Sequence, residues 1–300
     1  NNKFMKTFLL IDSNALIHRC FHALPPFTTK DGKPSGALYG LSSVLIRILH
    51  PDKKTDSNGV SGKLPDYIVA FFDRPEPTFR KEMYNEYKIH RPKAPDEIIS
   101  QIIEAHNLFE AFDIKTYEIP GFEGDDLIGT AVEKFKNISD TQIIILTGDA
   151  DILQLVENDK VVVETFKKGI SDTIIYNEEG VKNKYGLLPK QLPDYKGLVG
   201  DQSDNIKGVA GVGPKTASQI LQKYETIENF LQNGQKEKSY QKVFEQQESA
   251  RLSKKLSEIK RDVPLEIQTI EKLKYEGLPK EKIAAYFENL GFQSLIKRIN

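Results

Sequence analysis

Carboxylate-rich turns are the residues of this chain whose types and spacing could perform chemistry. Residues 121–126, with the sequence GFEGDD, place Glu123, Asp125 and Asp126 directly before an apolar run. One or two acids would serve as a helix start, because acidic residues favour the positive end of a helix. A third carboxylate beside them adds like-charge repulsion, which a bound cation would offset. The segment therefore predicts either a helix start or part of a cation site.

Other acids stand directly after apolar runs that are expected to be strands, or in a polar turn. Each acid taken alone fits a turn or a capping residue, but that explanation has to apply independently at five separate loops, residues 121–126 included. Two of the acids lie three residues apart in the sequence GDQSDN at 200–205 and could share one helix face. These further acids are Asp12, Asp73, Asp149, Asp151, Asp201 and Asp204.

Carboxylates gathered in one cleft repel one another unless divalent cations bind there. Ligation by oxygen alone suits Mg²⁺ or Mn²⁺, whereas no Cys and His pattern has the spacing of a zinc site. Hard cations held by carboxylates suit hydrolysis of a phosphodiester, because they polarise the phosphate and lower the pKa of a bound water. The acids therefore predict a site for two or more Mg²⁺ or Mn²⁺ ions.

A basic and aromatic stretch begins soon after Asp73. Its later members lie 4, 7, 8 and 11 positions from the first, a spacing that predicts one shared helix face. Such a face can hold phosphates and stack bases. A half-buried amphipathic helix whose cationic side chains extend to solvent would show the same spacing. The residues are Arg80, Tyr84, Tyr87, Lys88 and Arg91.

A glycine-rich hairpin at 208–213 precedes a predicted helix, and Pro214 fits an early position of that helix. Backbone N–H groups at such a helix start can bind a phosphate without reading its base, and Lys215 adds a positive charge. An ordinary turn between helices is the alternative. The three glycines lie two or three residues apart, which favours close backbone approach to a ligand. The spacing is not that of a P-loop.

The elements that must position these residues alternate between apolar strands and helices. This alternation predicts an α/β fold with a mainly parallel sheet, whose ligand site lies beyond the carboxyl ends of the strands. Helices are expected at 13–23 and 37–49, a flexible polar loop at 51–66, and only helices from about Leu192 onward. The expected strands are 7–11, 67–72, 115–118, 143–146, 161–165 and 173–176.

Composition narrows the class of protein. The chain has 300 residues, enough for one large or two modest domains. A single cysteine, Cys20, excludes an internal disulfide and fits a reducing compartment. No apolar run reaches transmembrane length, and no signal peptide is visible. Met5 is the expected natural start, with the residues before it left over. Net charge is −1, and removing the nine acids named above leaves +8, as expected of a chain that binds metal centrally and phosphate around it.

These motifs together resemble the 5′ nuclease domain at the N-terminus of bacterial DNA polymerase I, within the flap endonuclease superfamily. The resemblance runs from about Phe8 to at least Val263. It is carried by GFEGDD at 121, TGDAD at 147, GDQSDN at 200, GVGPKTA at 211, YKIHRP at 87 and RCFHAL at 19. The loop at 51–66 looks longer than usual for the family and has no assigned role.

The resemblance implies a PIN-like catalytic core at 1–190 with a helical arch near 76–100. It further implies a helical DNA-binding region at 191–300, with a helix–three-turn–helix motif at about 192–225. All nine acids match family metal-site positions. Lys88 matches the arch lysine placed against the scissile phosphate, and Arg80 and Arg91 match neighbouring basic positions. The expected catalytic residues are Lys88 and Arg80, which would stabilise the negative charge that develops on the phosphate. The hairpin at 208–213 matches a loop whose carbonyls hold K⁺ against DNA. Expected DNA contacts are Arg19, Tyr84, Tyr87, Arg91, Gly208, Gly211, Gly213, Lys215 and Thr216.

The function implied is a divalent-metal-dependent, structure-specific 5′ nuclease of replication and repair, acting as 5′-3′ exonuclease and flap endonuclease. Its partner would be DNA with a flap, nick or branch, with no membrane involved. It is expected to be a cytoplasmic monomer at the bacterial nucleoid, with a polymerase region in the same or another chain. A PIN-type ribonuclease explains the acids but not the 208–213 hairpin. An inactive branched-DNA-binding module predicts a depleted acid set, and no acid is missing.

Overall fold

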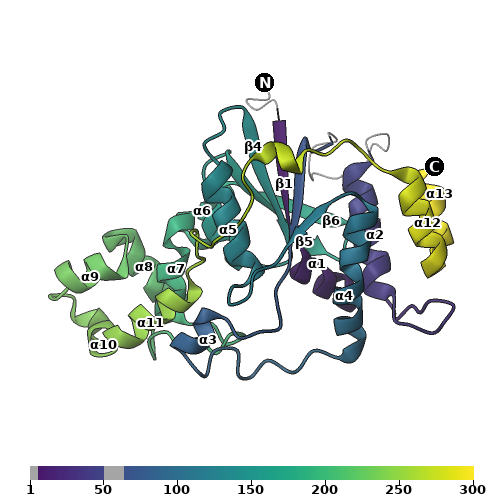
Figure 1. Cartoon of the computed structure of the whole chain (residues 1–300). Helices are drawn as coiled ribbons and strands as arrows, with labels where there is room; N and C mark the ends of the chain where they lie inside the picture. Colours follow the sequence, from purple (N-terminus) through teal and green to yellow (C-terminus); the bar gives the residue numbers. More distant parts are fainter. Residues whose placement is uncertain (1–5, 51–63) are drawn as a thin grey trace.

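A computed structural model describes residues 6–50 and 64–300 (Figure 1). Most of the loop expected at 51–66, and the expected start at Met5, lie outside the described residues. The chain forms a sheet covered on both faces by helices, and a separate group of helices extends to one side.

Six strands form one sheet in the order β3-β2-β1-β4-β5-β6. All neighbouring pairs are parallel except β5 and β6, which are antiparallel. The predicted mainly parallel sheet is confirmed, because apolar runs buried on both faces are typical of parallel strands. The strands are β1 (Lys6–Asp12), β2 (Tyr67–Phe71), β3 (Lys115–Tyr117), β4 (Thr141–Thr147), β5 (Val161–Lys168) and β6 (Asp172–Tyr176).

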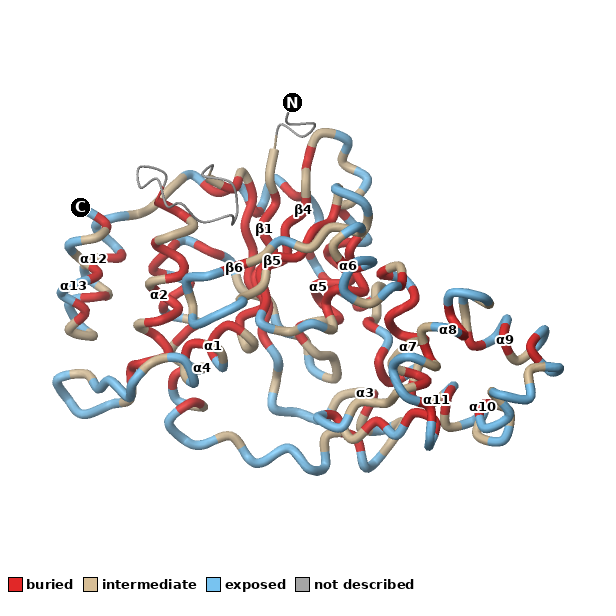
Figure 2. The backbone as a smooth tube through the Cα atoms, turned by 180° about the vertical axis from the view of Figure 1, so that it is seen from behind, coloured by how far each residue is buried: buried red, intermediate tan, exposed pale blue. Residues whose placement is uncertain are grey.

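Alternate residues of the strands feed two apolar cores. Leu9 and Ile11 of β1 face one core, which is covered by α1 (Ser13–Ala23), α2 (Gly36–Leu49) and α4 (Asp96–Ala111). Phe8 and Leu10 face the other, which is covered by α5 (Gly124–Phe135) and the 3₁₀ helix η1 (Asp151–Leu155). Successive strand side chains point to opposite faces, so both faces of the central strand are buried (Figure 2).

A helical group with its own core follows the sheet, and the described residues after Leu192 form no further strand of the sheet, as predicted. Its apolar core is built around residues such as Leu198, Ile220 and Phe230, away from the strands. Two short helices lead from the sheet to this group: α6 (Glu178–Tyr185), whose Val181 packs in the core on the α5 side of the sheet, and η2 (Pro189–Gln191). The elements of the group itself are α7 (Leu192–Val199), α8 (Pro214–Tyr224), α9 (Ile227–Asn233), η3 (Lys238–Tyr240), α10 (Gln241–Glu245) and α11 (Gln247–Ser257).

The chain then returns to the α/β body, which differs from the expected single region at 191–300. After α11 the backbone runs along the α5 side of the sheet and forms η4 (Ile270–Leu273). It ends in α12 (Lys280–Leu290) and α13 (Gln293–Ile299), which pack on α4 and α2 at the opposite end of the molecule from α9 (Figure 1). Amphipathic periodicity predicts a helix with a buried face but does not say which core that face joins.

The segment expected to be a helical arch is mostly irregular. Helix α3 covers only Phe79–Met83, turns follow, and α4 begins at Asp96. The predicted shared helix face for residues 80–91 is therefore wrong. Two features oppose a continuous helix: Lys88 has a φ of +55°, and Pro92 and Pro95 restrict the backbone before α4.

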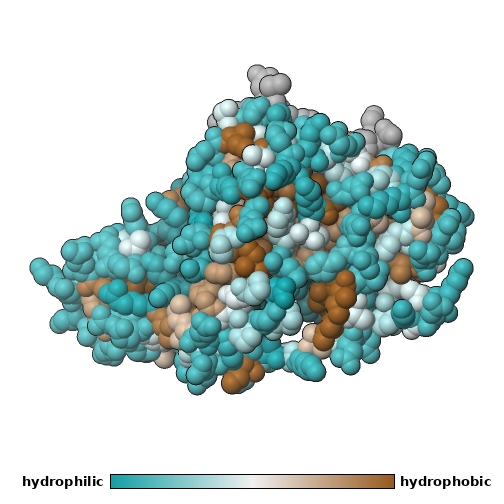
Figure 3. Space-filling model, viewed as in Figure 1, coloured by the Kyte–Doolittle hydropathy of each residue, from teal (hydrophilic) through white to brown (hydrophobic). Residues whose placement is uncertain are grey.

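The surface seen in Figure 3 is mostly hydrophilic, and its apolar side chains gather in small groups. Among the described helices, none combines the length and the apolar character needed to cross a membrane.

Candidate active site

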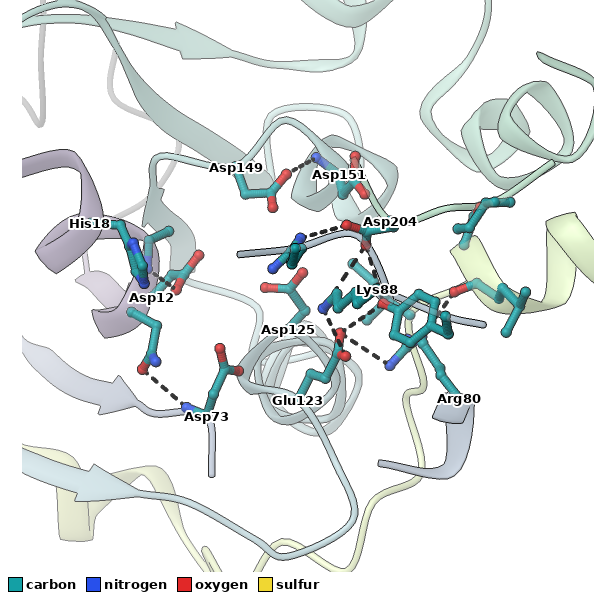
Figure 4. Close-up of a pocket in the computed structure, with 18 residues that line it drawn as sticks. Asp12, His18, Asp73, Arg80, Lys88, Glu123, Asp125, Asp149, Asp151 and Asp204 are labelled. Atoms are coloured by element: carbon teal, nitrogen blue, oxygen red, sulfur yellow. Dashed lines mark hydrogen bonds and ion pairs between the residues drawn. The ribbon is translucent and has the colours of Figure 1, made fainter. Parts of the chain in front are cut away.

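An acid-lined pocket of about 240 Å³ lies at the carboxyl ends of β1, β2 and β4. Figure 4 shows its labelled carboxylates around a common space, with Asp125 near the centre. The structure thus brings together seven of the nine predicted acids from loops far apart in sequence. They are Asp12, Asp73, Glu123, Asp125, Asp149, Asp151 and Asp204.

Asp12 and Asp73 are held by the strand ends they follow. Asp12 ends β1 and caps α1, with Oδ1 accepting from the Ala15 N–H at 3.1 Å and Oδ2 from the Thr147 hydroxyl at 2.6 Å. The Asp73 Oδ1 accepts from the Gly124 N–H at 2.6 Å. Capping and site formation are therefore not alternatives here, because the same carboxylates do both.

Asp149 and Asp151 follow β4 in a tight turn. The Asp149 N–H donates to the Thr147 hydroxyl oxygen at 2.9 Å, and the Asp151 N–H donates to Asp149 Oδ1 at 2.8 Å. Asp151 then opens η1, while Asp125 lies in the first turn of α5. The end of β4 and the starts of η1 and α5 thus set the positions from which these side chains extend.

Electrostatics in the pocket favours a bound cation. Burial raises the pKa of Asp12 to about 7. Burial, together with the nearby Asp12 and Asp149, raises the pKa of Asp125 well above its ordinary value. Burial and the charge of Asp149 raise the pKa of Asp151 to about 6. These carboxylates therefore repel one another when ionised, and divalent cations that prefer oxygen ligands would offset that repulsion.

The donor set fits such ions, but the side chains are not arranged as a finished ligand shell. Within residues 6–50 and 64–300, no three Asp, Glu, His or Cys groups are placed so that they could hold a metal ion as they stand. Ligation would therefore require rotations of these side chains, and the metal role of the pocket acids stays a prediction.

Asp126 lies outside the pocket, contrary to its predicted place in the site. It is fully buried, and its two carboxylate oxygens accept from Arg80 Nη1 at 2.7 Å and Nη2 at 2.8 Å. They also accept from the backbone N–H groups of Glu123 at 3.1 Å and Lys260 at 2.9 Å. This carboxylate is occupied in holding α3, α5 and the returning chain together.

Arg80 does not face solvent as expected of a phosphate contact. It contributes to the pocket wall but is only 3% exposed. Besides Asp126, its guanidinium donates to the carbonyls of Leu256 at 2.9 Å and Glu258 at 2.8 Å. These four hydrogen bonds make Arg80 a buried structural residue. Neither interpretation of the spacing predicted this burial, because both place the guanidinium at the surface.

Asp201 also lies outside the pocket lining, and residues 201–206 form a turn rather than the expected helix face. Its Oδ2 accepts from Lys196 Nζ at 2.6 Å, and its Oδ1 accepts from the Ser203 hydroxyl at 2.6 Å. Burial would raise the pKa of Asp201, but Lys196 and Ser203 outweigh burial and hold the pKa at about 2. Lys196 pairs with Asp151 as well. A role for Lys196 could not be predicted from the sequence, because a lysine near the end of a helix belongs to no distinctive motif.

The basic stretch contacts the pocket through Lys88 and Arg91. Lys88 Nζ lies 2.8 Å from Glu123 Oε1, and Arg91 Nη2 lies 2.5 Å from Asp204 Oδ1. Tyr87 is only 4% exposed, so the expectation that it stacks on a base is not met. Its hydroxyl instead donates to Asp204 at 3.2 Å and Glu123 at 3.3 Å. Tyr84 is half-buried and donates to Glu86 at 2.8 Å.

Three uncharged or weakly basic residues of the α1 region also line the pocket and were not predicted. They are Asn14, Ala15 and His18. The available signal was their position in the helix that Asp12 caps, because the first turns of that helix start at the pocket.

The remaining predicted DNA contacts lie away from the pocket. Gly213 caps the start of α8 with Pro214 as its first residue, as predicted, and Lys215 is exposed there. A Cβ at Gly208 would lie 2.3 Å from the Gly200 nitrogen, so glycine is needed for this close approach. Arg19 on α1 donates to the Gly169 carbonyl at 2.9 Å. Gly211 and Thr216 belong to the same hairpin and helix start as Lys215.

Fold and pocket together define an α/β protein with an acidic site at the carboxyl edge of a mainly parallel sheet. Residues 7–186 match the family model of the 5′-3′ exonuclease N-terminal resolvase-like domain, and residues 187–281 match that of the 5′-3′ exonuclease C-terminal SAM fold. The chain therefore belongs to the 5′-3′ exonuclease family, and the predicted resemblance and nuclease class are confirmed.

Two relatives illustrate the range of chain lengths. DNA polymerase I of Bacillus subtilis is 36% identical over 299 residues, which are 98% of this chain and 32% of the relative. The 5′-3′ exonuclease of Aquifex aeolicus is 35% identical over 298 residues, which are 99% of this chain and 96% of the relative. The chain thus spans about a third of the length of the polymerase relatives and nearly all of the exonuclease.

Solved structures share the fold at low sequence identity. The T5 D15 protein crystallised with metal ions has a TM-score of 0.65 at 18% identity, with 98% of this chain and 100% of that chain covered. Human GEN1 in complex with Holliday junction DNA has a TM-score of 0.64 at 14% identity, with 99% and 72% covered. The expected fold class is confirmed by these matches.

Proposed function

We propose that this chain hydrolyses DNA phosphodiesters at 5′ flaps, nicks and 5′ ends, using divalent cations held by the acid-lined pocket. The observation that carries the proposal is the convergence of seven carboxylates, from separate elements, beside the cationic Lys88 and Arg91. Structural relatives described as a T5 flap endonuclease with DNA and metal ions and as the catalytic core of Rad2 with DNA support a DNA substrate.

Two or more Mg²⁺ or Mn²⁺ ions would be held by the pocket acids, chiefly Asp12, Asp73, Asp125, Asp149 and Asp151. A T5 5′-exonuclease structure with bound divalent ions, zinc in that case, supports divalent binding by this fold. When bound, such ions polarise the phosphate and lower the pKa of a water ligand. Asp126 and Asp201 would support the site through Arg80 and Lys196 without ligating the ions directly.

The chain's own cations would bind and orient the phosphate. Lys88 lies close enough to the pocket acids to meet a phosphate oxygen held there, and its charge would count most as negative charge develops in the transition state. Arg91 would neutralise Asp204 and contact the DNA backbone from the pocket edge. Arg80 would position Asp126 instead of contacting the phosphate.

The hairpin before α8 would grip duplex DNA at a distance from the pocket. The exposed N–H groups at the start of α8 and Lys215 suit a phosphate. A K⁺ ion at the backbone of 208–213 is supported by the resemblance of that hairpin to the family motif. We further propose a monomer acting on DNA at the bacterial nucleoid, beside or joined to a DNA polymerase region.

The test is cleavage of a labelled 5′-flap DNA with Mg²⁺, with and without EDTA. We expect cleavage with Mg²⁺, none with EDTA, and none by an Asp149→Ala variant that still binds the flap. Preferential cleavage of an RNA flap would favour the PIN-type ribonuclease. Tight flap binding by the wild type without cleavage in Mg²⁺ or Mn²⁺ would favour the inactive DNA-binding module.

A further inference from the structure

The segment that carries Lys88 rests on the turn at 201–206, which precedes the glycine-rich hairpin. We propose that Asn205, in this turn, is a positioning residue that fixes the backbone of Lys88 for phosphodiester cleavage. The inference rests on the catalytic role proposed above for Lys88, and it adds to that role the group that holds the lysine in place.

Two hydrogen bonds join the segments on either side of Tyr87. The Asn205 side-chain amide, through Nδ2, donates to the Glu86 carbonyl at 2.8 Å. The Lys88 N–H donates to the Asp204 carbonyl at 2.9 Å. The residues on either side of Tyr87 are thus bonded to two adjacent residues of the turn, so the backbone leading to Lys88 is held at two points.

Backbone geometry explains why this hold matters. Lys88 has a φ of +55° and Asn205 a φ of +56°, both in the left-handed region. Asparagine enters that region readily, but a lysine does so at a cost. Such a conformation persists only where the surroundings over-determine it. Without the bond from Asn205, Lys88 would be freer to return to a negative φ, which would swing its side chain away from Glu123.

Apolar packing seats the segment but does not set the angle of Lys88. Tyr87 is buried with Ile206 and Leu256 in a small apolar cluster. This cluster anchors position 87. The hydrogen bonds to Glu86 and Lys88 then fix the backbone on either side, and the Lys88 ammonium is held 2.8 Å from Glu123.

The same turn continues directly into the hairpin proposed to bind duplex DNA. Gly208 packs against Gly200 so closely that neither position has room for a side chain. The Gly208 N–H also donates to the Ser253 hydroxyl oxygen of α11 at 2.9 Å, which holds Gly208 against that helix. The turn is therefore rigidly joined to the hairpin, and the rigid turn is what holds Lys88.

The test is an Asn205→Gly variant, because glycine keeps the left-handed backbone and removes only the side-chain donor. We expect the single-turnover cleavage rate of a 5′-flap in Mg²⁺ to fall about ten- to a hundredfold, as small misplacements of catalytic groups typically cause. The flap affinity measured in Ca²⁺ should change less than about threefold, because phosphate contacts elsewhere supply most of the binding.

Asn158 offers a matched control, since it is also an asparagine with positive φ, at +49°, in a turn away from the pocket. Asn158→Gly should cleave at the wild-type rate. In a Lys88→Ala background, Asn205→Gly should lower the rate by less than about twofold, because the group it positions is gone.

An Asn205→Gly rate equal to or above wild type would overturn the inference. So would a full additional loss in the Lys88→Ala background, because the effect would then not pass through Lys88. Absence of cleavage by the wild type would instead count against the proposed function, so the two failures are distinguishable.

Discussion

Replacing Arg80 with methionine would test whether this residue is a buried structural residue or a phosphate contact. Methionine keeps an unbranched, flexible stem and removes the guanidinium with its charge. The change leaves the Asp126 carboxylate, which is fully buried, without the guanidinium that donates to it at 2.7 and 2.8 Å. It also leaves the Leu256 and Glu258 carbonyls without these donors.

The magnitude follows from the burial of both partners. Removing one partner of a buried ion pair costs roughly 3–5 kcal/mol, and total stabilities are only about 5–15 kcal/mol. For a chain of this size, each kcal/mol lowers the melting temperature by about 2–4 °C. We therefore expect Arg80→Met to melt about 10 °C below the wild type. Binding of flap DNA by the folded fraction should change little.

A double variant and a surface control sharpen the measurement. Arg80→Met with Asp126→Leu removes the unpaired buried carboxylate and should recover part of the lost stability. Recovery should be incomplete, because the Glu123 and Lys260 N–H groups and the Leu256 and Glu258 carbonyls lose their partners. Arg74→Ala removes surface ion pairs with Glu76 and Glu118 and should leave the melting temperature close to that of the wild type. Urea unfolding and thermal melts would report all three. Wild-type stability in Arg80→Met, together with a large loss of cleavage rate, would refute the structural role and place Arg80 on the substrate.

Three further predictions concern the pocket and the hairpin. Burial raises the pKa of Asp12 and Asp125, so the native state binds more protons than the unfolded chain and metal-free stability should fall as the pH rises from about 4 to 7. Asp125→Asn removes one of these charges and should raise the melting temperature in EDTA at pH 8; an unchanged melting temperature would contradict this. Lys88→Ala should lower the single-turnover rate about a hundredfold with little change in flap affinity in Ca²⁺, and equal losses in both would make it a binding residue only. Lys215→Ala should weaken binding to all sequences alike and reduce the salt slope by about one, whereas a sequence-dependent loss would argue against a phosphate contact.

Local pattern was sufficient to predict the strands and the end of the sheet where the acids gather. The apolar run at 7–11, for example, predicts a buried strand, and Asp12 directly after it lies at the carboxyl end of that strand, in the pocket. Parallel pairing brings all such edges together, so the convergence of Asp12, Asp73 and Asp149 follows from topology.

Partner choice could not be predicted in the same way. Asp125 and Asp126 are adjacent in one motif, yet Asp125 lines the pocket whereas Asp126 is bound to Arg80, 46 positions earlier in the sequence. Asp201 is likewise taken by Lys196. Periodicity reports which side of a helix is polar, but it does not report which buried charge a carboxylate meets across the fold. The left-handed backbone at Lys88 also depends on contacts from the distant 201–206 turn.

The return of the chain after α11 makes the α/β body discontinuous along the sequence. Tyr67 of β2 bridges to Lys274 and donates to Glu271 at 2.7 Å, across more than 200 intervening residues. Closing so long a loop costs entropy before its contacts form, whereas the helices from α7 to α11 pack mainly among themselves. The helical group can therefore fold as a local unit while the sheet still lacks its last cover, and the body that holds the carboxylates is completed only when the C-terminal residues have been made.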